Sequence, residues 1–247
     1  MEREEYARMY ALEDYYWWFV GKRRIAATLL QAYLPPCNDR LILDVGCGTG
    51  GMLQFLLSEY GTAYGLDLSP IALGLGQQRN LSRLALGSAL VLPYADASFS
   101  VVTAFDLLYH QWVDDDLLAL RECRRVLRPG GALLITDSAF RFLWSGHDLA
   151  YGARRRYTTR ELRRQVEAAG LQVKRLSYAN AFLFPAVLAV RLWKRLRPSS
   201  GGGGSDLRPL PSGLNRLLAG IYTAEARLLR WVDYPVGVSV VCLAIKS

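Results

Sequence analysis

The sequence predicts an α/β protein built on a doubly wound, mostly parallel sheet of seven strands. Three observations support this fold class. Short apolar runs alternate with stretches of helical periodicity, and a glycine-rich turn follows the first run. In addition, 51% of the 247 residues are hydrophobic and 21% are charged, which is typical of a globular protein. Strands that alternate with helices form parallel sheets because each helix returns the chain to the same edge.

The first half of the chain supplies four strands and two of the helices between them. The first helix signal follows the glycine turn and ends before Gly61. The second begins at Ser69 and Pro70, an N-cap residue followed by the residue preferred at the first helical position. The predicted strands are 41–45, 62–68, 85–89 and 99–105, and the first helix is 51–60.

The second half continues the same alternation and ends on a strand. A helix over 114–127 begins with acids and ends with arginines, as the helix dipole favours. A further helix over 158–169 is ended by Gly170. The predicted strands are 132–138, 171–177 and 236–246, and we expect the last one to be antiparallel to its neighbours.

These elements predict four segments along the chain. About 58 residues separate the last two strands, too many for a simple connection, so a helical insert is expected there. The insert contains helices over 181–196 and 214–231, joined by a flexible Gly- and Pro-rich linker. The segments are an N-terminal helical cap (1–36), an α/β core (37–178), the insert (179–233, linker 198–213) and a final core strand (234–247).

The charge of the chain is concentrated in one region. The net charge is +8, but residues 154–197 contain twelve Lys and Arg and only two acids. One interpretation is a solvated helix face, and the other is a surface for an anionic substrate or an acidic membrane. The region contains no recognisable nucleic-acid module, so we expect no nucleic-acid partner.

The cysteines and the N-terminus indicate the compartment. The four cysteines are widely spaced and form no CxxC pair, which favours a reducing environment and predicts no metal site. The N-terminus is polar and acidic, unlike a secretory signal. The longest apolar stretch, 181–190, is too short to span a bilayer. We therefore expect a cytoplasmic protein, with peripheral membrane contact as an alternative.

The glycine turn "LDVGCGTGG" is the first candidate ligand site. Glycine lacks a Cβ, so backbone at such a strand–helix corner can approach a ligand closely. Gly46, Gly48 and Gly51 match the dinucleotide pattern G-x-G-x-x-G, and Asp67 follows where an acid could bind ribose hydroxyls. Counting Gly50 in place of Gly51 gives D-x-G-x-G-x-G instead. The glycines alone therefore leave two classes of nucleoside cofactor open.

The surrounding segments distinguish these classes. Over residues 41–137 the chain resembles the class I S-adenosylmethionine-dependent methyltransferases. The segments that carry this resemblance are, in order, "LDVGCGTGG", "GLDLSP", "ALVLPYADASFSVV" and "HQWVDDDLLALRECRRVLRPGG". The resemblance implies their Rossmann-like fold and S-adenosylmethionine as cofactor. It implies that Asp67, with Leu68 beside it, binds the ribose, and that Ser88 and Ala89 face the adenine, although many relatives carry an acid at Ser88. The remaining implied cofactor-binding residues are Asp44, Gly46, Cys47, Gly48 and Gly50 around the turn, and Asp106 and Leu107 at the methionine end.

The N-terminal segment "YYWWFVGKRR" and the segment "LWSGHDLAYGARRRYTTREL" (143–162) are candidates for covering the acceptor. The first is similar to a bacterial methyltransferase subgroup that begins with an aromatic-WF-x-GRR segment, and the second continues that similarity. The successive aromatic residues at 15–19 cannot all face one core, so at least one tryptophan is expected over the ligand. Ordinary helix packing is the alternative. The predicted lid and substrate residues are Tyr16, Trp17, Trp18, Arg23, Trp144 and Arg156.

The two histidines, His110 and His147, are the candidate general bases. Both follow strands whose carboxyl ends meet at one edge of the sheet, and histidine titrates near neutral pH. His147 is favoured because the adjacent Asp148 could orient or charge it. The alternative for each is a histidine that only binds loop backbone. The arginines at 154–156 either bind a carboxylate or phosphate of the acceptor or lead into the helix that begins at Thr158.

The main hypothesis is methylation of oxygen or nitrogen on a small-molecule acceptor, either anionic or lipid-linked. The insert helix over 181–196 is interpreted as a lid over the sheet or as an interfacial helix that admits a lipid. The alternatives to methyl transfer are a non-catalytic cofactor-binding relative and, through the G-x-G-x-x-G count, a nicotinamide-dependent oxidoreductase. The sequence does not indicate an oligomeric state.

Overall fold

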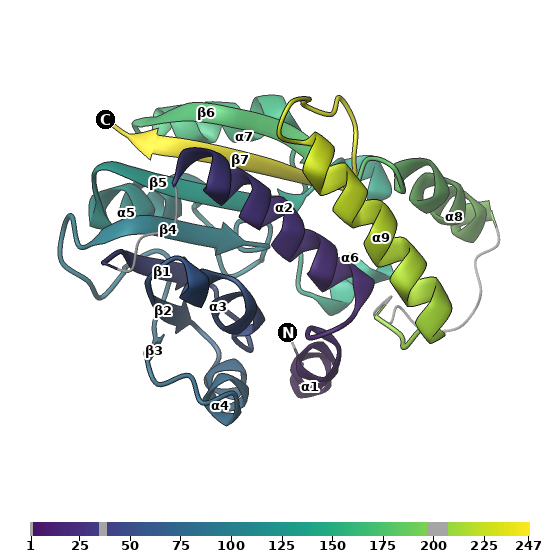
Figure 1. The fold of residues 1–247 in the computed structure, drawn as a ribbon, viewed down its shortest axis with the longest axis horizontal. Coiled ribbons are helices and arrows are strands. Elements are labelled where there is room, and N and C mark those ends of the chain that lie inside the picture. The colour runs from purple at the N-terminus through teal and green to yellow at the C-terminus, as the bar shows by residue number, and fades with distance from the viewer. Residues whose placement is uncertain (1, 35–38, 197–206) are drawn as a thin grey trace.

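The computed structural model describes residues 2–34, 39–196 and 207–247, and within these residues seven strands form one sheet (Figure 1). The strand order is β3-β2-β1-β4-β5-β7-β6, in which the first five strands are parallel and β7 pairs antiparallel with both β5 and β6. The predicted fold class is therefore confirmed. The strands are β1 (Leu41–Val45), β2 (Thr62–Asp67), β3 (Leu84–Leu86), β4 (Phe99–Phe105), β5 (Leu127–Ser138), β6 (Leu171–Ala179) and β7 (Ser239–Lys246).

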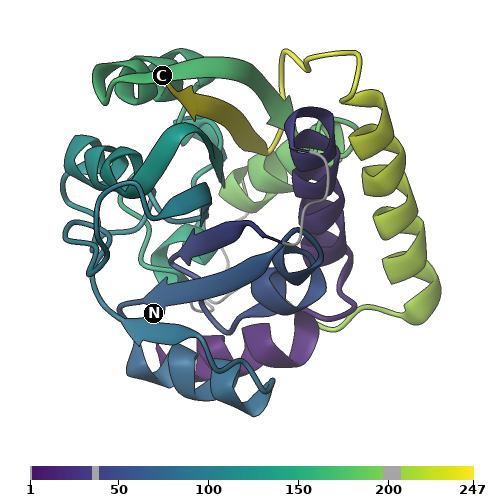
Figure 2. The ribbon, with the colours of Figure 1, turned by 60° about the vertical axis from the view of Figure 1, so that its left-hand side comes forward.

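Helices cover both faces of the sheet. One face carries α2 (Trp17–Tyr33) and α9 (Ser212–Leu228), which run side by side, and the other carries α5 (Asp116–Val126) and α7 (Thr159–Ala168) (Figures 1 and 2). Shorter elements and the peripheral helices lie mainly around the carboxyl ends of the parallel strands. These are α1 (Arg3–Leu12), α3 (Gly51–Phe55), α4 (Pro70–Gln78), α6 (Gly146–Ala150) and α8 (Phe184–Leu196).

The central strands are buried on both faces, which explains why their sequences are continuous apolar runs. Ile42 and Leu43 of β1 point to opposite faces and are both fully buried, as are Leu133 and Leu134 of β5. The sheet thus forms a rigid platform that fixes the loops at its carboxyl edge.

Several predicted boundaries differ from the structure. The helix expected over 51–60 ends at Phe55 and is followed by a 3₁₀ turn, because Leu56 leaves the helical region with φ −143°. α8 begins at Phe184 rather than at 181, and β5 already begins at Leu127. α9 begins at Ser212, inside the predicted linker, whose residues 198–206 lie outside the described part of the chain.

The N-terminal helices are joined to α9 by close packing at Gly21. A Cβ on Gly21 would lie 1.9 Å from Cδ1 of Tyr222, a fully buried ring on α9 that also packs against Trp17 and Trp18. The Asn215 side chain adds two hydrogen bonds, because it accepts from Trp17 N (2.8 Å) and donates to Tyr15 O (2.9 Å). α2 is therefore fixed against α9 as well as packed on the sheet through Ile25, Leu29 and Leu30.

We expect Gly21→Ala to destabilise the protein by about 1 to 3 kcal/mol, because the added methyl group must displace the Tyr222 ring. Gly220→Ala in α9 is the matched control, since a Cβ at Gly220 would meet nothing within 4 Å. The control should be neutral or stabilising by up to about 1 kcal/mol. Urea denaturation midpoints measure both effects, and equal midpoints would contradict the packing argument.

Candidate active site

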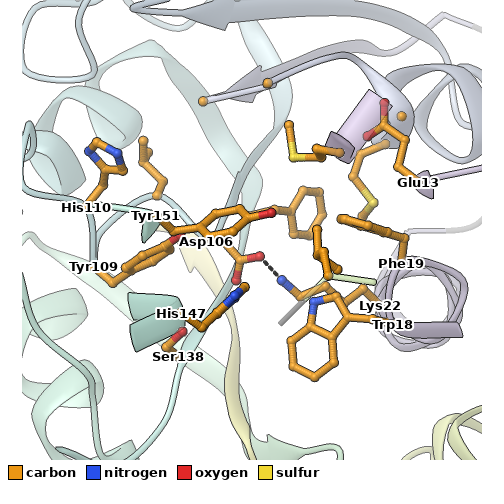
Figure 3. Close-up of a pocket in the computed structure, with 18 of the residues that line it drawn as sticks. Glu13, Trp18, Phe19, Lys22, Asp106, Tyr109, His110, Ser138, His147 and Tyr151 are labelled. Carbon is orange, nitrogen blue, oxygen red and sulfur yellow. Dashed lines mark hydrogen bonds and ion pairs between the residues drawn. The ribbon is translucent and has the colours of Figure 1, made fainter. Parts of the chain in front are cut away.

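A cavity of about 530 Å³ opens at the carboxyl ends of the parallel strands (Figure 3). Its volume lies within the range of small-molecule and cofactor sites. Its walls come from α1, α2, α6, α8 and the loops that follow β1, β2 and β4. Most of the predicted site residues line it: Tyr16, Trp17, Trp18, Arg23, Asp44, Gly46, Cys47, Gly48, Asp67, Leu68, Ser88, Ala89, Asp106, Leu107, His110, His147 and Arg156.

Two predicted residues are not part of this lining, Gly50 and Trp144. Gly50 is the N-cap residue of α3 with φ +84°, and a Cβ there would lie 2.3 Å from Leu81. Glycine at this position is therefore required by the turn and by packing against Leu81. Trp144 lies at the end of a short 3₁₀ turn before α6. The sequence pattern could not distinguish these roles from ligand contact.

The glycine turn leaves room for a ligand at two positions. Gly46 and Gly48 have φ values of +75° and +55°, which side chains rarely adopt. A Cβ would lie 2.8 Å from Leu107 Cδ1 at Gly46 and 3.0 Å from Met9 Cε at Gly48. A larger residue at either position would fill the cavity between the turn, α1 and the loop after β4.

Asp67 is held at the end of β2 by two backbone donors. Its Oδ2 accepts from Gly48 N and its Oδ1 from Ser69 N, both at 2.8 Å. Burial raises the pKa of Asp67, and the backbone N–H groups oppose this effect. Each carboxylate oxygen retains an acceptor site, because a carboxylate accepts about four hydrogen bonds. The carboxylate can therefore receive two neighbouring hydroxyl groups from the cavity side.

Asp44 places a second carboxyl group in the same wall. It is buried and accepts a hydrogen bond from Thr103 Oγ1 at 2.6 Å. Burial raises the pKa of Asp44 to about 7, against the effect of the Thr103 hydroxyl. A positively charged ligand group nearby would favour the ionised form, since an opposite charge offsets the cost of burial.

The two histidines have different surroundings. His110 accepts from Trp112 N at its Nδ1 (3.3 Å), and burial lowers its pKa to about 4, so it is a weak base at neutral pH. His147 is the second residue of the short helix α6, and its ring centroid lies 4.4 Å from that of Tyr151. Figure 3 shows His147 directed toward the part of the cavity that contains Asp106. Of the two, His147 is the stronger candidate base.

The expected role of Asp148, to orient or charge His147, stays a prediction, and the structure shows further partners of this residue. Both of its carboxylate oxygens accept hydrogen bonds from the Arg156 guanidinium, at 2.7 and 3.0 Å. Oδ2 also accepts from Ser145 N, which completes the capping box of α6. Arg156 is buried in this pair, although it borders the cavity. The predicted capping box of Thr158 and Glu161 is present at the start of α7.

The aromatic segment lines the cavity and also packs within the fold. Trp17 and Trp18 line the cavity and also pack against each other edge to face, with ring centroids 5.6 Å apart. Tyr16 is buried. Arg23 donates to Glu13 O (2.6 Å) and Asp14 O (2.8 Å), so it also fixes the turn between α1 and α2.

Sequence reasoning did not find Lys22 and Glu13 as contributors to the site, and it named α8 as a lid without its cavity-lining residues. Lys22 forms an ion pair with Asp106 inside the cavity, and the Glu13 carboxylate accepts from the Thr49 hydroxyl behind the glycine turn. Apolar residues of α8, among them Val187 and Val190, form a further wall. Lys22 could have been identified from its helical spacing, since it lies one turn after Trp18. The other two contacts join distant parts of the chain.

The described residues were also compared with the requirements of a membrane span and of a metal site, and they meet neither. None of the helices in 2–34, 39–196 and 207–247 combines the length and the apolar character needed to cross a bilayer. Across the same residues, no group of three or more His, Cys, Asp or Glu side chains is arranged to hold a metal ion.

Comparison with known proteins supports the interpretation of this cavity. Residues 43–135 match the family model described as "Methyltransferase domain". The chain is 35% identical over 118 residues to malonyl-[acyl-carrier protein] O-methyltransferase of Pseudescherichia vulneris, covering 47% of this chain and 46% of that protein. It is 33% identical over 117 residues to norajmaline N-methyltransferase of Rauvolfia serpentina, covering 44% and 39%. The chain thus spans less than half the length of these curated relatives.

A solved structure from Thermotoga maritima, described as a S-adenosylmethionine-dependent methyltransferase and possible histamine N-methyltransferase, shares the fold. The TM-score is 0.61 at 20% identity, over 99% of this chain and 95% of that one. The matched residues 43–135 include the glycine turn, Asp67 and Asp106.

The cavity fits S-adenosylmethionine. Three features suit a nucleoside with a cationic amino-acid tail. Gly46 and Gly48 bring backbone to the cavity wall, Asp67 can accept hydroxyl groups, and Asp44 places a buried carboxyl group beside them. Ser88 and Ala89 would face the adenine, and Ser88 Oγ accepts from Leu90 N (3.1 Å). Residues 43–135 therefore match a methyltransferase domain within a Rossmann-like fold, and the cavity fits S-adenosylmethionine as its cofactor.

Proposed function

We propose that the protein transfers the methyl group of S-adenosylmethionine to an oxygen or nitrogen atom of a small-molecule acceptor. The observation that carries this proposal is one cavity that contains both the hydroxyl-binding Asp67 beside the glycine turn and the groups Lys22, Asp106 and His147. When bound, the cofactor supplies a methyl group on a positively charged sulfur. The chain must then align the acceptor, exclude water and remove a proton.

The far wall of the cavity supports an acceptor with an apolar body and an anionic group. Leu183 just before α8, together with Val187 and Val190 of α8, provides apolar surface, and Arg191 and Lys194 of the same helix add positive charge. The two curated relatives are named for different acceptors, malonyl-[acyl-carrier protein] and norajmaline. The proposed acceptor class therefore rests on the cavity walls. A lipid-linked anion would fit the same apolar and positively charged walls.

The N-terminal residues 1–36 act in this proposal as the lid of the bacterial subgroup with the aromatic-WF-x-GRR segment. The lining by Trp17 and Trp18 supports this role. Peripheral membrane contact through α8 belongs to the same proposal, because Leu192 and Trp193 are about half exposed beside Lys194. Cosedimentation with anionic vesicles, compared with neutral ones, measures that contact.

Calorimetry with S-adenosylhomocysteine and with NAD tests the cofactor. We expect S-adenosylhomocysteine to bind and NAD not to bind, because Asp67 accepts hydroxyls at the end of a turn shaped for an amino-acid tail. Binding of NAD alone would favour the oxidoreductase hypothesis and overturn the proposal.

Transfer of a labelled methyl group to a panel of acceptors tests catalysis. Anionic acceptors with long apolar chains should react faster than short neutral ones. Binding of the cofactor without transfer to any acceptor, in a panel that includes lipid-linked anions, would favour the non-catalytic relative. His147→Ala and His110→Ala belong in the same assay, and His110→Ala should have the smaller effect because of the low pKa of His110.

A further inference from the structure

The Lys22 side chain is a buried amine at the centre of the cavity. It extends from α2, is 6% exposed, and forms an ion pair with Asp106, whose side chain is 34% exposed. The Trp18 ring, one helical turn earlier, lies 5.3 Å from Nζ. Figure 3 shows Lys22 and Asp106 meeting between Trp18 and His147. A buried amine that reaches a ligand cavity is unusual, because lysine is rarely buried unless paired.

Charged and titratable groups face Lys22 from each element packed around it. Asp106 follows β4, and Asp137, buried in β5, accepts from Tyr109 N (3.1 Å) and Ser138 N (2.8 Å). The buried Tyr222 of α9 packs on the same turn of α2, while Tyr109 and His147 line the cavity. Two carboxyl groups therefore surround one amine.

The surroundings leave the protonation of this cluster finely balanced. Burial lowers the pKa of Lys22 to about 7, against the opposing effect of the Asp137 carboxylate. Burial likewise raises the pKa of Asp137 to about 7, against its backbone hydrogen bonds and Lys22. A small change of charge in the cavity can therefore change the protonation state of Lys22 near neutral pH.

We propose, on the basis of the function proposed above, that Lys22 is a catalytic residue: it loses its proton when the cationic cofactor enters the cavity, and its neutral amine then takes the proton of the acceptor. The O–H or N–H bond of the acceptor breaks and its proton moves to Nζ. The electron pair left on the acceptor atom forms the bond to the transferred methyl group, and the pair that held this group stays on sulfur.

Charge balance in the cavity supports this assignment. In the free protein the Lys22 ammonium balances the Asp106 carboxylate. A second cation in the same cavity disfavours the ammonium, because like charges in a poorly solvated site repel strongly. Asp106 then balances the cofactor instead. After transfer the sulfur is neutral and Lys22 again carries the proton, so each stage pairs one cation with Asp106.

Calorimetry in buffers of different ionisation enthalpy measures the protons released on binding. When S-adenosylmethionine binds at pH 7, the wild type should release about half a proton more than Lys22→Met. At pH 8.5 this difference in proton release should fall to about 0.1 or less, because a group with a pKa near 7 has already lost its proton there. S-adenosylhomocysteine, whose sulfur is neutral, should show no such difference between wild type and variant. Equal proton release from wild type and Lys22→Met would overturn the proposal.

Lys22→Arg is the conservative variant, because arginine keeps the charge beside Asp106 but cannot lose its proton. It should weaken binding of S-adenosylmethionine about 10-fold or more relative to S-adenosylhomocysteine, since two cations then share the cavity. Lys22→Met and Lys22→Arg should both lower turnover about 100-fold or more. An unchanged ratio of the two affinities in Lys22→Arg would also contradict the proposal.

His147→Ala distinguishes the two candidate bases. It should retain the proton release of the wild type and lose less turnover than the Lys22 variants. If His147→Ala loses the proton release while the Lys22 variants keep it, the base is His147 and Lys22 is rejected. Failure of the wild type to bind either form of the cofactor would instead reject the proposed function, so the two failures are distinguishable.

Discussion

Asp67→Asn is expected to weaken binding of S-adenosylhomocysteine about 100-fold while leaving the protein folded. The substitution removes the charge and one of the two carboxylate acceptors, and hydrogen bonds to charged groups contribute about 1.5 to 3 kcal/mol each. Gly48 N or Ser69 N, which both donate to Asp67, also loses its acceptor. Because Asp67 is only partly buried, the effect on unfolding should be small compared with the effect on binding.

A ligand analogue without the two ribose hydroxyls isolates the contact. This analogue should bind the wild type and Asp67→Asn with similar affinity. The coupling energy between Asp67 and the ribose hydroxyls should then be close to the whole loss of binding free energy that Asp67→Asn causes. Asp96→Asn is the control, because its side chain is 77% exposed on the surface and pairs with Arg125. Similar affinities of wild type and Asp67→Asn for S-adenosylhomocysteine would show that Asp67 does not bind the ribose.

The cofactor half of the site could be predicted because it depends on local geometry. Sequence spacing and the parallel order of β1 and β2 set three features: Asp44 near the end of its strand, a turn with Gly46 and Gly48, and an acid at the end of the next strand. Parallel neighbours place their carboxyl ends at one edge of the sheet, so the approximate position of Asp67 follows from the fold.

The acceptor half could not be predicted to the same degree because it depends on long-range contacts. Lys22 and Asp106 are 84 residues apart, and their pairing requires α2 to lie over the end of β4. The placement of α2 depends in turn on Gly21 and Tyr222, which are 201 residues apart in the sequence. No local pattern encodes such a contact. Gly50 shows the converse case, since the motif implies ligand contact for this glycine while the structure gives it a packing role against Leu81.

Arg79→Ala is expected to destabilise the protein by about 3 to 5 kcal/mol and to loosen α1 from the cofactor cavity. The guanidinium of Arg79 is buried and pairs with Glu13 at 2.8 Å. It also donates to Thr49 O (3.1 Å) and Tyr10 O (3.0 Å) and lies 4.3 Å from the Tyr10 ring. Arg79 thus joins the end of α4, the glycine turn and the turn after α1.

Removing this cation leaves the Glu13 carboxyl buried without its main charge partner. Burial already raises the pKa of Glu13, and the Thr49 hydroxyl and Arg79 oppose this effect. In Arg79→Ala the pKa of Glu13 should rise further, so the folded state binds a proton that the unfolded state lacks. The stability deficit relative to the wild type should therefore shrink as the pH falls from 7 toward 5. Urea denaturation at both pH values measures this difference.

Arg163→Ala provides the matched control, because Arg163 and Glu167 form an exposed pair one helical turn apart. Its effect should be about 0 to 1 kcal/mol and independent of pH over this range. Hydrogen exchange separates loosening of the cap from global unfolding. In Arg79→Ala, amides of α1 should exchange faster than those of β4, and added S-adenosylhomocysteine should restore part of their protection, since Tyr6 and Met9 of α1 line the cavity. Equal acceleration in α1 and β4 would show that Arg79 stabilises the whole fold and does not specifically hold the lid.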